Sequence, residues 1–62
     1  MDSKLVLLTP KEAAKLLNTT EASLATWRCR KTVQIPYIKI GRAIRYDLRD
    51  LEAFIERQKI DN

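Results

Sequence analysis

The residues with the clearest chemical meaning are basic, and they are concentrated in one part of this 62-residue chain. Seven of the twelve Lys and Arg residues lie between Arg28 and Arg49, with a single acid, Asp47, so this segment carries a net charge of +6. The rest of the chain sums to −2. Because concentrated positive charge attracts polyanions, the pattern favours nucleic acid as the partner over a plain charged surface.

Groups that could support catalysis are scarce. Histidine is absent, so the usual general base is missing, and Ser23, Thr26 and Cys29 have no predicted partner that would activate them. The single glycine excludes a glycine-rich phosphate loop. A lone cysteine without histidine can complete neither a zinc site nor an internal disulfide. We therefore expect no enzyme activity, no metal and no cofactor.

Length and hydropathy predict one small domain, residues 1–62, with a core spanning about residues 6–58. The longest apolar run, Leu5–Leu8, is too short to cross a bilayer or to form the centre of a signal peptide. We expect a cytoplasmic protein without a membrane partner.

Two short helices are predicted in the first half of the chain. Thr9 can cap the first one, with Pro10 at its first position and Glu12 completing a capping box. Asn18 is a plausible left-handed stop, since asparagine tolerates a positive φ. Thr20 then caps a second helix that runs from Glu21 to about Lys31.

The second helix has two different sides on a helical wheel. One side contains Leu24, Trp27, Arg28 and Lys31. The other contains Ala22, Ser23, Thr26, Cys29 and Arg30. The second side is small and polar, so it can approach the floor of a DNA groove closely while Leu24 and Trp27 pack on the body of the protein. Arg28 either packs its stem on the core and bonds to backbone carbonyls, or reaches toward a phosphate.

After Lys31 the apolar period changes to two, which predicts a β-hairpin around Gly41. A three-residue loop, 41–43, would place all the large apolar residues of the hairpin on one face: Ile38, Ile40, Ile44 and Tyr46. Lys39 and Arg45 would then project together from the opposite face, with Arg42 at the tip. We expect a hairpin that is apolar inside and basic outside.

The last predicted element is a third helix capped by Asp47. Its core-facing positions are Leu48, Leu51, Phe54, Ile55 and Gln58. Its outward positions are Arg49, Glu52, Glu56 and Arg57. At the other end of the chain, residues 4–8 either add a short strand or pack over the apolar side, and we expect Asp2 and the last few residues to be frayed. The expected fold is mainly α, with three short helices and a two-stranded hairpin.

Four segments in order carry a likeness to a known family. They are LTPKEAAKLL at 8–17, SLATWR at 23–28, PYIKIGRAIRY at 36–46 and DLEAF at 50–54. Together they resemble the excisionase and AlpA-like helix-turn-helix family, which is related to the DNA-binding domains of MerR regulators. The resemblance covers about residues 6–56 and implies a winged helix-turn-helix, in which the hairpin is the wing.

This resemblance implies sequence-specific binding of double-stranded DNA by a recombination directionality factor or a small transcription regulator of a mobile element. Ser23, Thr26 and Arg30 would enter the major groove, and Arg42 would meet a phosphate or the minor groove. The full set of candidate DNA-binding residues is Thr20, Ser23, Thr26, Arg28, Arg30, Lys31, Lys39, Arg42 and Arg45. An integrase or recombinase, and further copies of the chain bound cooperatively on DNA, are the implied protein partners.

Two alternatives remain open from the sequence. The basic patch could dock an acidic protein partner, which would make the chain an adaptor for a recombinase or phage component. Single-stranded DNA binding is the other alternative, and it needs exposed aromatic side chains on which bases can stack. Only Tyr37 is a good candidate for such a platform, because Tyr46 and Phe54 have the pattern of buried residues.

Overall fold

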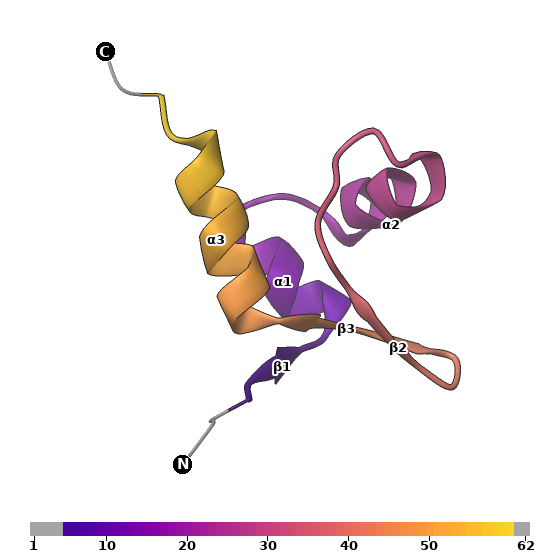
Figure 1. Cartoon of the computed structure of the whole chain (residues 1–62). Helices are drawn as coiled ribbons and strands as arrows, with labels where there is room; N and C mark the ends of the chain where they lie inside the picture. The colour runs from indigo at the N-terminus through magenta and orange to yellow at the C-terminus, as the bar shows by residue number, and fades with distance from the viewer. Residues whose placement is uncertain (1–4, 61–62) are drawn as a thin grey trace.

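The computed structural model describes residues 5–60, which form three helices and a small three-stranded antiparallel sheet (Figure 1). The elements in chain order are β1 (Leu7–Leu8), α1 (Pro10–Leu16), α2 (Glu21–Arg30), β2 (Ile38–Ile40), β3 (Ala43–Asp47) and α3 (Leu48–Gln58). The predicted class, mainly α with a β wing, is confirmed. Asp2, Lys4 and residues 61–62 lie outside the described residues, so the expected fraying of Asp2 and of the chain end at 61–62 is not described.

Short-range hydrogen bonds pair free backbone groups at both ends of α1, as predicted. The Thr9 N–H donates to the Glu12 carboxylate at 2.9 Å, and the Glu12 N–H donates to Thr9 Oγ1 at 3.1 Å. At the other end Asn18 has a φ of 57°. This left-handed residue lets the Thr19 N–H reach the Ala14 carbonyl at 2.8 Å, so the helix ends in a Schellman motif.

The second helix starts almost at once, which makes the turn between α1 and α2 tight. Thr20 caps α2 by accepting a hydrogen bond from the Ser23 N–H at 3.0 Å. Lys31 ends it in a left-handed conformation, with a φ of 56°. Helices α1 and α2 pack against each other. The predicted helix-turn-helix is therefore present.

The sheet has the order β1-β3-β2, so β3 is its central strand. The N-terminal segment adds a strand, one of its two expected arrangements, and pairs Leu7 with Asp47 and Leu8 with Tyr46. On the other side of β3 the register pairs Ile38 with Arg45, Lys39 with Ile44 and Ile40 with Ala43.

The hairpin register corrects one prediction. The turn contains two residues, Gly41 and Arg42, and not the three expected, because Ala43 is already paired with Ile40. Gly41 has a φ of 61° and is the only turn residue in the left-handed region, as in a type II′ turn. An alanine in a left-handed third position would be strained, whereas in the strand it pairs without strain.

This register changes which side chains share a face. Cross-strand partners point to the same side, so Lys39 lies on the face of Ile44, and Arg45 lies on the face of Ile38. The prediction that Lys39 and Arg45 share one basic face is wrong. Ile40 is also not in the core. It lies on the face of the hairpin that is turned away from the core, and it is 55% exposed.

The core is small and draws on every helix and on the central strand. Its buried apolar members are Ala13, Ala14, Leu24, Ile35, Tyr46 and Leu51. Partly buried residues that pack around them are Leu8, Leu17, Trp27, Val33, Ile44 and Phe54. Trp27 therefore packs on the core, as predicted. Helix α3 is capped by Asp47 as expected. The prediction that Ile55 and Gln58 face the core is wrong: both are exposed, because the helix extends past the core toward its C-terminal end.

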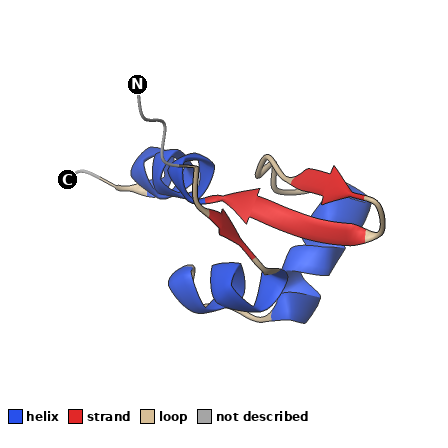
Figure 2. Cartoon of the chain, turned by 90° about the horizontal axis from the view of Figure 1, so that it is seen from below, coloured by secondary structure: helices blue, strands red, loops and turns tan. Residues whose placement is uncertain are grey.

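Two views establish which elements lie together. In both, α2 and the β2–β3 turn occupy the same end of the molecule, and α3 occupies the opposite end (Figures 1 and 2). A ligand that spans the first end can therefore meet a helix and a hairpin at once.

Candidate nucleic-acid interface

The exposed side of α2 consists mainly of small side chains. Leu24 is buried and Trp27 and Arg28 are half-buried, whereas the outward positions are open to solvent. The exposed residues of α2 after its first residue are Ala22, Ala25, Thr26, Cys29 and Arg30. Sequence reasoning missed Ala25, because on the wheel it lies near the border between the two sides. A helix with so little bulk can lie close to the edges of base pairs.

At the start of α2, Thr20 and Ser23 bond to each other. The Thr20 hydroxyl donates to Ser23 Oγ at 3.0 Å, in addition to the capping bond described above. Because Ser23 Oγ accepts in this pair, its own proton remains available to an external acceptor. Ser23 is half-buried and Thr20 is exposed, so both lie at the rim of the exposed side of α2.

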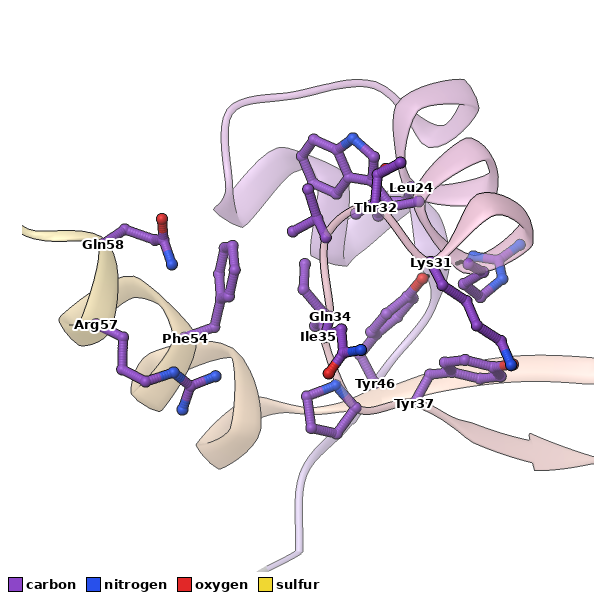
Figure 3. A pocket seen from close by; sticks show the side chains of 14 residues that line it. Leu24, Lys31, Thr32, Gln34, Ile35, Tyr37, Tyr46, Phe54, Arg57 and Gln58 are labelled. Atoms are coloured by element: carbon purple, nitrogen blue, oxygen red, sulfur yellow. Dashed lines mark hydrogen bonds between the residues drawn. The ribbon is translucent and has the colours of Figure 1, made fainter.

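Arg28 is turned toward the hairpin. Its Nη1 donates to the Tyr46 hydroxyl at 2.6 Å, and its guanidinium carbon lies 5.8 Å from the centre of the Tyr37 ring. The two tyrosine rings are 6.5 Å apart and tilted by 53°. Figure 3 shows the Tyr46 hydroxyl pointing toward α2. The partner of Arg28 is thus a tyrosine side chain and not the backbone carbonyl that the sequence suggested.

The basic residues of the hairpin occupy its tip and both of its faces. Lys39 and Arg42 are exposed, and Arg42 is the second residue of the turn. Arg45 is half-buried and donates to the Ile44 carbonyl at 2.7 Å, which holds its guanidinium against the strand. Positive charge on two faces suits a hairpin that enters a groove with phosphates on either side.

The single acid of the basic segment lies away from the hairpin tip. Asp47 is at the far end of β3, and its carboxylate forms an ion pair with Arg49 at 3.2 Å. Hydrogen bonds from the Arg49 side chain and from its backbone N–H hold the pKa of Asp47 below its ordinary value of 3.8. The acid is consequently ionised and neutralised by its neighbour, and the tip keeps its positive charge.

Behind α2 an open groove separates the 31–37 loop from α3 (Figure 3). It encloses about 900 Å³, and its walls include the aromatic residues Trp27, Tyr37 and Phe54. The charged residues that line it, Arg28, Lys31 and Arg57, are all basic. Lys31 belongs both to this groove and to the end of α2, so the two surfaces adjoin.

The part of the chain that the structure describes contains neither a metal-binding cluster nor a membrane-spanning helix. Residues 5–60 contain no group of three or more His, Cys, Asp or Glu side chains placed to hold a metal ion. None of the described helices is long and apolar enough to cross a membrane.

Comparison with known proteins gives one match. The model of a family described as "Helix-turn-helix domain" matches residues 7–59, which covers all the helices and strands. No curated protein and no solved structure matches the chain.

Proposed function

We propose that this chain, which belongs to the helix-turn-helix domain family of excisionase and AlpA-like small DNA-binding domains, binds double-stranded DNA with α2 in a major groove and the β2–β3 hairpin in the adjacent minor groove. The family consists of DNA-binding domains that are typically not enzymes. A relation to MerR regulators is part of the proposal and rests on the sequence resemblance alone.

The observation that carries the proposal is the position of two elements. Helix α2, whose outward residues are exposed, and the β2–β3 turn with exposed Arg42 lie at the same end of the molecule. A duplex presents a major and a minor groove side by side, so it can contact both surfaces together.

The proposed contacts divide into two kinds. Ser23, Thr26 and Arg30 read base edges, since their side chains lie on or beside the exposed side of α2. The proposed phosphate contacts are Thr20, Lys31, Lys39, Arg42 and Arg45. Such contacts supply most of the affinity, which should therefore fall steeply with added salt.

The finer role we propose is that of an excisionase-type directionality factor or a small transcription regulator. A domain of this size makes few base contacts, so specificity would come from copies bound cooperatively at adjacent sites and from bending of the DNA between them. In the excisionase case, the bent site would favour assembly of an integrase complex in one direction, with protein contacts made by the acidic flanks of the chain or by α3.

The alternative functions have weaker support. Tyr37 is 45% exposed, but its ring lies beneath the Arg28 guanidinium, which disfavours it as a platform for an unpaired base. The basic lining of the groove behind α2 is the observation that favours an adaptor with an acidic partner. An adaptor that binds its partner in this groove would not need the basic residues of the hairpin tip.

Gel shifts with duplex, single-stranded and scrambled DNA at two salt concentrations test the proposal. The duplex should be one recovered by this protein from a random library. The double variant Arg30→Ala, Arg42→Ala should lose binding while its circular dichroism stays unchanged. The matched control is Arg57→Ala, Lys59→Ala, which removes the same charge from the opposite end and should bind as the wild type does. Full affinity in the first double variant would overturn the proposal.

A further inference from the structure

We infer that Arg28 is a positioning residue, which sets the angle between α2 and the β2–β3 hairpin through Tyr46, and is not itself a DNA contact. The inference rests on the proposed function and deepens it, because it identifies what makes the two DNA-binding surfaces fit one duplex. It concerns the link between the surfaces and not the surfaces themselves.

Few other contacts connect α2 with the β2–β3 hairpin. Helix α2 packs mainly on α1, and the hairpin is attached to the body through β3, which contacts α1, α3 and β1. No strand packs extensively on α2. Besides the 31–37 loop, which connects α2 to β2 along the chain, the Arg28–Tyr46 bond joins these two elements directly.

The geometry of the link is specific to these side chains. Tyr46 is 1% exposed, so its hydroxyl needs a hydrogen-bond partner, and the 2.6 Å contact with Arg28 satisfies it. A charged donor makes this bond stronger than one between neutral groups. Tyr37, the residue just before β2, places its ring against the same guanidinium, so Arg28 contacts β3 and the segment that leads into β2.

The two tyrosines are the partners of Arg28 in the part of the chain that the structure describes. Among residues 5–60 the structure contains no ion pair to Arg28 and no hydrogen bond from it except the one to Tyr46. Its guanidinium is half-buried beside the hairpin, whereas Arg30 and Lys31 are exposed at the same end of α2. Those neighbours can meet phosphates without breaking the link.

The position of Arg28 leads to a distinctive expectation for DNA binding. A phosphate contact releases counterions, so its removal lowers the slope of log K against log salt by about 0.9. A positioning residue changes affinity through the geometry of the other contacts, and the slope should not change when the charge is retained. Tyr46→Phe removes the hydroxyl but keeps the buried ring and every charge, which makes it the most informative substitution.

The first experiment measures the free protein by NMR. Amide residual dipolar couplings give the orientation of α2 relative to the hairpin in the wild type, in Tyr46→Phe and in Arg28→Lys. We expect both variants to change this orientation or to broaden its distribution. Tyr37→Phe is the matched control, because it keeps the ring under Arg28 and loses a hydroxyl that forms no hydrogen bond within residues 5–60. An unchanged orientation in Tyr46→Phe and Arg28→Lys would overturn the inference.

The second experiment measures binding to the selected duplex across a salt series. We expect Tyr46→Phe and Arg28→Lys each to bind roughly tenfold more weakly, with unchanged salt slopes. The double variant should bind no more weakly than either single variant, since both break the same link. If Arg28→Ala lowers affinity and slope while Tyr46→Phe leaves both unchanged, Arg28 is a phosphate contact and the inference is wrong.

The two experiments separate this inference from the proposed function. If the wild type selects no duplex, the proposed function fails, and the NMR orientation still decides whether Arg28 links the elements. If the duplex binds and the orientation does not depend on Tyr46, only the inference fails.

Discussion

Ile40 and Ala43 face each other at the end of the hairpin ladder, with only Gly41 and Arg42 between them. This pairing decides the environment of every side chain in the hairpin, because a strand alternates its faces at each residue. It turns Ile40 outward and Ile44 toward the core.

The register predicts unequal costs for two similar substitutions. Ile44→Ala should lower the free energy of unfolding by about 1–2 kcal/mol, since it removes a partly buried side chain from the core. Ile40→Ala should change it by less than about 0.5 kcal/mol, because Ile40 is exposed. Urea unfolding followed by circular dichroism measures both. Equal losses would indicate the three-residue loop with both residues inside.

The turn predicts an effect at Gly41 that does not depend on steric contact. A Cβ at this position meets no atom within 4 Å, but the φ of 61° disfavours alanine. Gly41→Ala should therefore reduce the free energy of unfolding by roughly 1–2 kcal/mol. Gly41→Asn should reduce it less, because asparagine visits the left-handed region more readily. The same urea titration distinguishes them, and an alanine variant as stable as the wild type would contradict the assigned turn.

The two kinds of proposed DNA contact predict different signatures. Thr26→Ala should relax the preference at one or two base pairs of the selected duplex and leave the salt slope unchanged. Lys39→Ala should weaken binding to all duplexes alike and lower the slope by about 0.9. Competition binding with single-position duplex variants measures both effects. A uniform loss across sequences in Thr26→Ala would show that this residue does not read bases.

The Asp47–Arg49 pair predicts a loss of stability in acid. Because the pKa of Asp47 is lowered in the folded protein, mainly by its hydrogen bonds to Arg49, ionised Asp47 favours folding. This contribution is present above the ordinary pKa of 3.8 and is lost as the pH falls through the lowered value.

Thermal unfolding across that range tests the contribution. The Asp47→Asn variant keeps a helix cap but cannot ionise, so its melting temperature should fall less steeply than that of the wild type between about pH 5 and pH 2. Glu52→Gln, an exposed carboxylate on the same helix, is the control and should follow the wild type. Parallel curves for Asp47→Asn and the wild type would contradict the prediction.

Much of the fold could be predicted because its signals are local. The bonds of Thr9 with Glu12 span three residues, and the stop at Asn18 needs only one tolerant residue, so nearby sequence indicates both helix ends. The candidate site was partly predictable for the same reason. Helical spacing places Thr26 and Arg30 outward, and the turn at Gly41 makes Arg42 a tip residue.

The missed features depend on segments that are distant in sequence. Ile35 lies in a loop without periodicity, so nothing in its neighbourhood indicates that it is buried. A preference for placing every large apolar residue inside suggested the longer hairpin turn. The backbone instead follows the positive φ available at Gly41, and the resulting one-residue difference reverses the face of Ile40.

The order of residues is sufficient to define the helix ends, the helix-turn-helix and the concentration of positive charge, because capping and charge act over a few neighbouring positions. Folding in three dimensions selects the hairpin register and brings Arg28 to Tyr46, 18 residues away. The register and this contact are decided by competition among packing arrangements. The local conformational preferences of the residues are similar in all of these arrangements. A pattern within one segment cannot rank these arrangements, since their energies differ in contacts between segments.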